Sequence, residues 1–265
     1  MISHNTAGRN WNLYTSQQET ALGDRLLGKC IDPPEDNAVV QRRKGHVSWK
    51  LDGEGFPLFV KKYYPRNIGN QFGYLGRTTR ADREIEAIAA LTDSGFSVPV
   101  LLASSERRKM GLWQDTILVF RYYPQFKNLR QLDWAVQGVA ELVDMLAEEI
   151  ARLHESGIVH GDLHGGNILV ARKSGEWHCL FTDFDKVSLS SAADDGVIDD
   201  LARLNGFVDC EMAQRNVFFT RYYQSRGISD SDELRRRVCQ RTEELWRNYN
   251  RKHGGDIRKY PCAEQ

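Results

Sequence analysis

Two short stretches in the second half of the chain carry residue types that could transfer a phosphoryl group. Residues 158–170 read IVHGDLHGGNILV, with Asp162 and Asn167 in a glycine-bearing loop, and residues 181–185 read FTDFD, with Asp183 after an apolar run. Phosphoryl transfer needs a carboxylate that orients the attacking hydroxyl group. It also needs ligands for Mg²⁺, which prefers carboxylate, amide and phosphate oxygens. The two stretches supply both kinds of group.

The spacing predicts a role for each residue. Asp162 and Asn167 have the D-x-x-x-x-N spacing of a kinase catalytic loop. We expect Asp162 to accept the proton of the acceptor hydroxyl, and Asn167 to hold a metal ion together with Asp183. The structural alternatives are a turn aspartate, a loop asparagine and an aspartate that ends a strand. The occurrence of both stretches at this separation favours the chemical interpretation.

A cation for the nucleotide phosphates is expected in the first half of the chain. Lys61 lies in LFVKK, at the end of a predicted strand, and Glu84 in the next predicted helix is its expected ion-pair partner. Lys62 competes with Lys61, because strand alternation points only one of them toward the site. Glu86 competes with Glu84 in the same way. Gly45 in RRKGHVSW is the expected turn over the phosphates, although the chain has no G-x-G-x-x-G.

These predictions define one site with three overlapping groups. The catalytic group is Asp162, Lys61 and Glu84, the nucleotide-binding group is Lys61, Gly45, Asn167 and Asp183, and the metal ligands are Asn167 and Asp183.

Three further polar residues lie close to these motifs. We expect His160 to be a structural histidine that hydrogen-bonds the backbone near Asp183. His164 either contacts substrate or fills space inside the loop. Asp200 in VIDDLARL either ties down the backbone of the loop from below or is an exposed residue at a helix start.

The flanking sequence predicts the elements that position these residues. Residues 38–64 alternate apolar and polar positions around a DGEG turn, which predicts two or three antiparallel strands. Residues 138–157 have apolar residues at helical spacing and end in a glycine. Further strands are expected at 98–104, 116–123, 167–171 and 177–185, and further helices around Glu19–Leu27 and at 79–93, 195–207, 210–225 and 231–252.

The order of these elements predicts an α+β protein with two lobes. An antiparallel-sheet N-lobe with one main helix is expected at residues 1–122, and a mostly helical C-lobe at residues 123–265. The N-lobe would hold the cation for the phosphates, and the C-lobe the catalytic and metal-binding loops.

The composition is that of a globular protein. Of 265 residues, 41% are hydrophobic, and Lys+Arg and Asp+Glu number 36 each, so a nucleic-acid partner is not expected. Five cysteines without a CxxC favour neither a disulfide framework nor a zinc site, and we expect reduced thiols. The first residues lack the apolar segment of a secretory signal, and no apolar run approaches the roughly 20 residues of a membrane span. We therefore expect a cytoplasmic protein.

The motifs resemble the protein-kinase-like superfamily, and within it they are most similar to the bacterial lipopolysaccharide core kinases, the Kdo and heptose kinase group. The likeness covers about residues 45–205. It is carried by LFVKKYY, ADREIEAIAALTDSGFSVPVLLAS, ILVFRYYPQFKNLRQL, GIVHGDLHGGNILV, FTDFDKV and DLARL. The resemblance implies a bilobal protein-kinase-like fold, ATP with Mg²⁺, and transfer of the γ-phosphate to a Kdo or heptose hydroxyl of the lipopolysaccharide inner core.

Departures from protein kinases favour a glycan or small-molecule acceptor. Gly161 precedes Asp162 where H-R-D kinases have an arginine, Asp185 replaces the glycine of D-F-G, and no A-P-E segment follows. An aminoglycoside-type phosphotransferase is an alternative, because VHGDLHGGNILV suits that group as well. A nucleotide-binding pseudokinase scaffold is a third reading. The joint presence of the expected lysine, base and metal ligands argues against it.

Two basic regions bear on the acceptor. Residues 61–80 combine Lys and Arg with aromatic residues and contain no acid, which predicts either a flap for an acceptor with carboxylates and phosphates or an exposed loop. Residues 215–260 have twelve Lys and Arg against six Asp and Glu. They predict either peripheral contact with the anionic inner face of the inner membrane, where the glycolipid acceptor would be held, or a C-lobe helix pair with solvated charges.

Overall fold

The computed structural model divides into two compact units. The first comprises Met1–Ile88 and Pro99–Pro124, and the second Ala89–Val98 and Gln125–Gln265. The change of unit after residue 124 lies beside the predicted lobe boundary at residue 122, whereas the short segment 89–98 groups with the second unit. The residues that the structure describes are 2–6, 9–14, 24–33, 35, 38–53, 55–74, 77–189, 194–207, 210–229 and 231–253.

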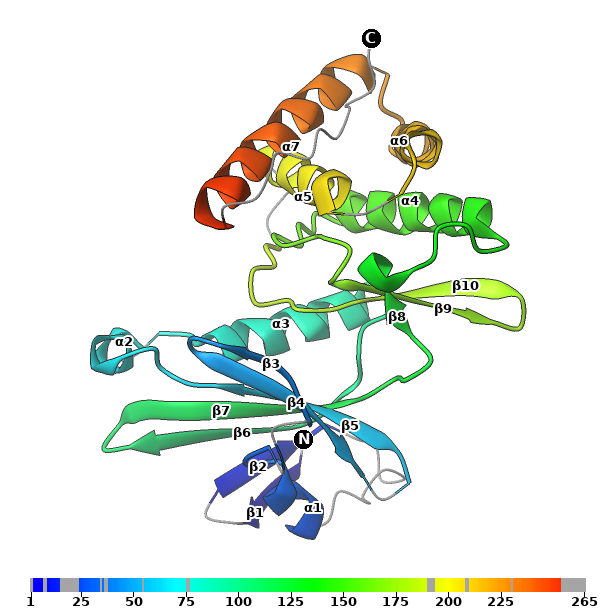
Figure 1. Ribbon diagram of the computed structural model, residues 1–265. Coiled ribbons are helices and arrows are strands. Elements are labelled where there is room, and N and C mark those ends of the chain that lie inside the picture. Colours follow the sequence, from blue (N-terminus) through cyan, green and yellow to red (C-terminus); the bar gives the residue numbers. More distant parts are fainter. Residues whose placement is uncertain are drawn as a thin grey trace. The chain divides into compact units, whose positions relative to one another are not determined.

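The first unit is built on a seven-stranded antiparallel sheet with the strand order β1-β2-β6-β7-β5-β4-β3 (Figure 1). The strands are β1 (Ile2–Thr6), β2 (Arg9–Leu13), β3 (Val39–Arg43), β4 (His46–Asp52), β5 (Pro57–Tyr63), β6 (Leu101–Lys109) and β7 (Leu112–Arg121). In β5, Leu58 and Val60 are fully buried, as alternation along a strand requires. They join a core that also contains Trp11 and Trp49.

The predicted strands of residues 38–64 are confirmed as β3, β4 and β5. The strands β1 and β2 were not predicted from the sequence. In β2 the sequence RNWNL buries Trp11 and Leu13 on one face. Asparagine is generally depleted in strands. The alternation of apolar and polar residues in β2 was therefore too short and too polar to predict a strand.

The helices of the first unit are α1 (Asp24–Lys29), α2 (Ile68–Gly73) and most of α3 (Arg80–Asp93). The expected short helix near Glu19–Leu27 corresponds to α1, but residues 15–23 lie outside the described residues. α3 begins with a capping box, since the Thr79 backbone N–H donates to Asp82 Oδ2 at 2.7 Å and the Asp82 backbone N–H donates to Thr79 Oγ1 at 3.1 Å. α2 was not predicted, and it lies within the basic region 61–80.

The second unit combines a small sheet with four long helices. The sheet has the order β10-β9-β8 and consists of β8 (Lys127–Asn128), β9 (Ile168–Lys173) and β10 (Glu176–Phe181), and a short 3₁₀ helix, η3 (Leu129–Gln131), follows β8. The helices are α4 (Val139–Glu155), α5 (Asp194–Phe207), α6 (Met212–Ser225) and α7 (Ser231–His253). α4 packs against α6, and α5 against α7 (Figure 1).

Local sequence explains the helix that precedes the glycine-bearing loop. α4 buries apolar residues at helical spacing on one side, including Leu142, Leu146 and Ile150. It ends where Gly157 adopts a positive φ of 74°, and the Ile158 N–H closes the cap by donating to the carbonyl oxygen of Leu153 at 3.2 Å. The chain then enters the loop directly.

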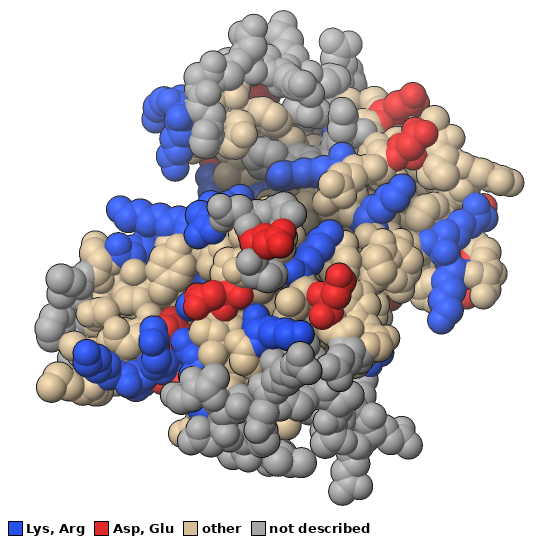
Figure 2. Space-filling view, turned by 60° about the horizontal axis from the view of Figure 1, so that its bottom comes forward, with Lys and Arg blue, Asp and Glu red and all other residues tan. Residues whose placement is uncertain are grey.

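The basic tail is largely a helix pair. Arg237 donates to Asp195 at 3.0 Å and Arg241 to Asp199 at 2.5 Å, which ties α7 to α5, while Val238 on α7 is fully buried. No helix in the described part of the chain has the length and apolar character needed to cross a bilayer. Basic and acidic side chains are interspersed on the face in Figure 2, in keeping with the formal net charge of zero.

The expectation of reduced thiols is met in part. Cys30 and Cys179 are buried free thiols, and burial raises the pKa of each to about 12. Cys239 is disulfide-bonded, so the expectation is wrong for that residue.

Candidate active site

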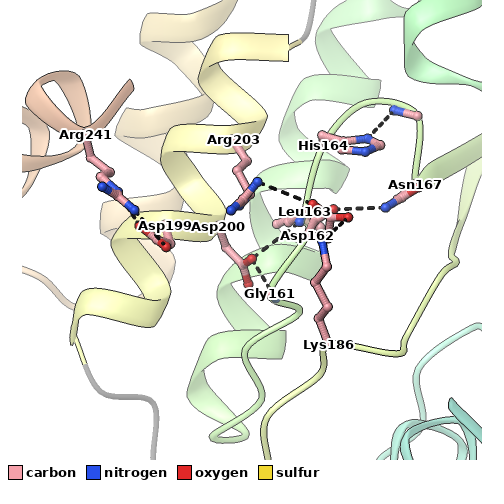
Figure 3. Close-up of polar contacts among 11 residues, drawn as sticks. Gly161, Asp162, Leu163, His164, Asn167, Lys186, Asp199, Asp200, Arg203 and Arg241 are labelled. Carbon is pink, nitrogen blue, oxygen red and sulfur yellow. Dashed lines mark hydrogen bonds and ion pairs between the residues drawn. The ribbon is translucent and has the colours of Figure 1, made fainter. Parts of the chain in front are cut away.

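The glycine-bearing loop of the second unit is held in place by one buried carboxylate on α5. Asp200 is fully buried and accepts a backbone hydrogen bond from His160 at 2.6 Å. It also accepts backbone hydrogen bonds from Gly161 at 2.9 Å and Leu163 at 3.4 Å (Figure 3). Of the two roles considered for Asp200, the structure therefore supports the residue that ties down the loop. Gly161 has a φ of 76°, a conformation that favours glycine.

Asp162 projects from this loop between two basic side chains. Lys186 Nζ lies 2.8 Å from Asp162 Oδ2, and Arg203 Nη1 lies 3.4 Å from Asp162 Oδ1 (Figure 3). The Asp162 side chain is 18% exposed, so it is accessible while it forms charge-assisted contacts with both cations. The sequence analysis did not identify Lys186 or Arg203. Both had a signal: Lys186 follows TDFD directly, and Arg203 stands three positions after Asp200, on the same face of α5.

Strand register brings Asn167 next to the segment that carries Asp183. Ile168 of β9 pairs with Phe181 of β10, so the residues just outside this pair face each other. The Asn167 carbonyl oxygen accepts from the Thr182 N–H at 3.0 Å and from Thr182 Oγ1 at 3.2 Å. Asp183 follows at once and has a φ of 68°, which is uncommon for a residue other than glycine and costs free energy.

The Asn167 side chain also contacts the loop. Its Nδ2 donates to the carbonyl oxygen of Asp162 at 3.0 Å (Figure 3). With the nitrogen engaged in this way, the amide oxygen is the atom suited to a metal ion. An amide oxygen and the Asp183 carboxylate form the oxygen donor set that Mg²⁺ prefers. The residues present thus fit a Mg²⁺ ion shared with phosphate oxygens.

The two loop histidines are structural. His160 Nε2 lies 3.0 Å from the carbonyl oxygen of Thr182 and must donate to it, as expected. His164 Nδ1 accepts from the Gly166 N–H at 3.1 Å. Burial, reinforced by the charge of Arg130, lowers the pKa of His164 to about 4, so the imidazole is neutral near pH 7. Of the two roles left open for His164, loop packing is the one that these contacts support.

In the first unit, the expected ion pair between Lys61 and Glu84 is present. Lys61 Nζ lies 2.6 Å from Glu84 Oε1, and Tyr63 donates its hydroxyl to Glu84 Oε2 at 2.6 Å. The Glu84 side chain is 2% exposed. Both carboxylate oxygens are therefore engaged, which fixes the position of the ammonium group. The sequence analysis did not identify Tyr63, although it lies two positions after Lys61 and shares its strand face.

The competing residues point elsewhere. Lys62 donates to the carbonyl oxygen of Ile31 at 3.0 Å and to Asp32 Oδ1 at 2.7 Å. Glu86 is exposed on α3. The geometry therefore favours Lys61 over Lys62 and Glu84 over Glu86.

Gly45 lies in the turn between β3 and β4, where it has a φ of 96°. It is buried, and its carbonyl oxygen accepts from the Tyr64 N–H at 3.0 Å. Gly45, Lys61 and Glu84 thus belong to the first unit, whereas Asp162, Asn167 and Asp183 belong to the second.

Comparison with known proteins agrees with this geometry. The model of the lipopolysaccharide kinase (Kdo/WaaP) family matches residues 41–223. Similar curated proteins are 3-deoxy-D-manno-octulosonic acid (Kdo) kinases. The protein of Haemophilus influenzae (strain PittGG) is 28% identical over 144 residues, which cover 54% of this chain and 59% of that protein. The protein of Vibrio cholerae serotype O1 is 25% identical over 220 residues, covering 76% and 90%. The chain thus spans less than two thirds of the Haemophilus relative.

Solved structures with the same fold include WaaP in complex with acyl carrier protein, with a TM-score of 0.59, 19% identity, and coverage of 78% of this chain and 88% of that chain. A spectinomycin phosphotransferase in complex with ADP and spectinomycin has a TM-score of 0.56 and 12% identity, with coverage of 85% and 84%. The predicted α+β, protein-kinase-like fold is confirmed.

Proposed function

Because the chain belongs to the lipopolysaccharide kinase (Kdo/WaaP) family, we propose that it transfers the γ-phosphate of ATP to a Kdo or heptose hydroxyl of the lipopolysaccharide inner core. The observation that carries this proposal is the hydrogen-bonded junction of the loop and the strand ends. Asn167 bonds the backbone of Asp162 through its side chain and the backbone of Thr182 through its carbonyl group. Base and metal-binding residues are therefore neighbours.

In the proposed reaction Asp162 orients the sugar hydroxyl and accepts its proton. Lys186 and Arg203 contact the two oxygens of the Asp162 carboxylate, and a carboxylate oxygen can accept a hydrogen bond from the hydroxyl. They also limit the rotamers that Asp162 can adopt, which helps to hold one oxygen toward the acceptor.

Asn167 and Asp183 would hold Mg²⁺, which when bound neutralises charge on the nucleotide phosphates. Lys61 would supply a second positive charge for the phosphates. Glu84 and Tyr63 keep that ammonium group in one position, so little reorganisation is needed when the nucleotide binds. Gly45 would cover the phosphates from the β3–β4 turn.

A negatively charged acceptor suits this site better than a cationic one. Lys186 and Arg203 surround the proposed base, and they would repel an aminoglycoside while attracting the carboxylate of a sugar acid such as Kdo. The charge around Asp162 therefore favours the lipopolysaccharide acceptor over the aminoglycoside alternative.

We further propose a cytoplasmic protein that meets its lipid-linked acceptor at the anionic inner face of the inner membrane. The arginines of RRR at 235–237 are engaged with Asn216, Glu233 and Asp195. Arg251 and Lys252 at the end of α7 are exposed and pair with no acid among the described residues. Those two side chains would supply the contact.

The test is incubation of purified protein with labelled ATP and extracted, dephosphorylated core glycolipid, followed by mass spectrometry of the glycan. The proposal predicts one added phosphate on Kdo or heptose, and none with the Asp162→Asn variant. A phosphate on neither sugar, in a preparation that binds ATP, would contradict it.

A further inference from the structure

A pocket in the first unit is lined by three arginines. Its volume is about 200 Å³, and Arg66, Arg80 and Arg83 reach it together with Tyr64 and Asn70. No Asp or Glu is among the described residues that line it. All these residues belong to the first unit, and none of the five has a role in the proposed chemistry. Gly45, the expected turn over the nucleotide phosphates, also lines the pocket.

The fold builds this pocket from separate elements. Arg66 follows β5, Asn70 lies on α2, and Arg80 and Arg83 lie in the first turn of α3. A Cβ atom on Gly45 would lie 3.0 Å from Cγ of Arg66, so only glycine allows the arginine to lie against the β3–β4 turn without displacement.

The aromatic residues beside the arginines are also fixed. The Arg80 guanidinium lies 5.4 Å from the ring centre of Tyr63. Trp113 forms part of the wall and donates its Nε1–H to Thr116 Oγ1 at 2.9 Å, while Tyr74 meets it edge-on with 4.8 Å between ring centres. The pocket therefore has a rigid side, which lowers the entropy cost of ordering a ligand.

Two acids near the start of α3 have other partners. Asp82 caps the start of α3 by accepting from the Thr79 N–H. Glu84 binds Lys61 and Tyr63 with its two oxygens. Arg66 is exposed and has no acidic partner among the described residues. Guanidinium groups that line one small pocket attract an anion to it.

The size and the donors indicate the class of ligand. Pockets that enclose a drug-sized molecule have about 300–1,000 Å³, so this one suits a small charged group. Planar guanidinium groups bind carboxylate or phosphate oxygens in pairs. Three of them offer more donors than the two oxygens of a carboxylate can accept, whereas a phosphate has three terminal oxygens.

We propose that this pocket binds a phosphate group. The source is either free phosphate or a phosphate carried by the glycolipid acceptor, and only the second source rests on the proposed function. Because Arg80 and Arg83 belong to α3, the ligand would contact the helix that carries Glu84.

The test is calorimetric titration of the full chain with inorganic phosphate, at constant ionic strength and without nucleotide or Mg²⁺. Arg66→Gln and Arg83→Gln should each raise the phosphate Kd about tenfold, because each removes charge-assisted hydrogen bonds. Arg77→Gln removes an exposed arginine from the same region but outside the pocket, and should leave the Kd unchanged. Lys61→Met should also leave it unchanged, because this lysine serves the nucleotide.

A second titration identifies the source. Lipid A in detergent micelles and its dephosphorylated form are compared on the wild-type chain and on Arg66→Gln. If the phosphorylated lipid binds more tightly than inorganic phosphate, and Arg66→Gln abolishes this difference, the phosphate on the glycolipid acceptor is the ligand. If the phosphorylated lipid and inorganic phosphate bind with equal affinity, free phosphate is the ligand. The proposal is overturned if neither probe binds, if Arg77→Gln weakens binding as much as Arg66→Gln, or if only Lys61→Met weakens it. Since no turnover is measured, this result is independent of the kinase assay.

Discussion

At the residue scale, each carboxylate near the proposed chemistry has partners that restrict it. Asp162 lies between Lys186 and Arg203, and Glu84 lies between Lys61 and Tyr63. The two arrangements differ in burial. The Asp162 side chain is 18% exposed, as a group that must meet a substrate requires, whereas the Glu84 side chain is nearly inaccessible.

Replacing Glu84 by alanine tests that positioning role. The change leaves the Lys61 ammonium without its fixed partner, so we expect kcat/KM for ATP to fall by about 10². The exposed Glu86→Ala, on the same helix, is the matched control and should retain wild-type kinetics. Steady-state kinetics on both variants check this, and equal rates for Glu84→Ala and Glu86→Ala would refute the role.

At the element scale, α5 holds the catalytic loop and also contributes to its charge. Asp200 accepts hydrogen bonds from three backbone N–H groups of the loop. Arg203, one helical turn later, contacts the Asp162 carboxylate. The helix itself was predictable from its apolar periodicity. The anchoring of the loop by Asp200 was one of two roles expected for that residue. The contact of Arg203 was not predicted, because 41 residues separate it from Asp162.

The neighbouring aspartates of α5 offer a matched pair of variants. Asp200→Ala leaves three loop N–H groups without their acceptor, because Asp200 is fully buried. We therefore expect the free energy of unfolding to fall by about 3 kcal/mol. Asp199→Ala breaks only a partly exposed ion pair with Arg241, and should lower the free energy of unfolding by less than about 1 kcal/mol.

Urea unfolding of both variants measures the difference. A cost for Asp200→Ala no larger than that for Asp199→Ala would show that the loop does not depend on this anchor.

The elements that the sequence predicted share a strong local signal. The helix α4 and the strands β3 to β5 have clear periodicity, whereas β2 is five residues long and rich in asparagine. Asp162, Asn167 and Asp183 were predicted as site residues because the proposed chemistry requires fixed residue types at fixed spacing. Lys186, Arg203 and Tyr63 were missed because the sequence alone does not reveal which charged or hydroxyl side chains meet in space.

At the scale of the whole molecule, the functional residues are divided between the two compact units. The proposed phosphate-binding lysine and its partners belong to the first, and the proposed base and metal ligands to the second. The family match at residues 41–223 spans both. The sequence predicted a lobe boundary at residue 122 because strand-rich segments precede that residue and mostly helical segments follow it.

The stability of the whole chain should depend on pH through its buried histidines. Burial lowers the pKa of His164 to about 4 and also lowers the pKa of His154. Below the unfolded pKa of about 6.5, the unfolded chain binds protons that the folded chain does not, so stability decreases as the pH falls from 6.5 toward 4. His164→Gln should reduce this dependence. Unfolding by urea at pH 7 and pH 5 measures it, and an equal loss in variant and wild type would contradict the assignment to His164.

The most direct test of the account measures ATP binding and phosphate transfer on one preparation of Asp162→Ala. Because Asp162 is assigned to the acceptor hydroxyl and not to the nucleotide, the Kd for Mg·ATP should stay within about twofold of wild type while turnover falls by about 10³. Asp183→Ala should instead weaken nucleotide binding and turnover together. Turnover of Asp162→Ala within tenfold of wild type would contradict the central claim.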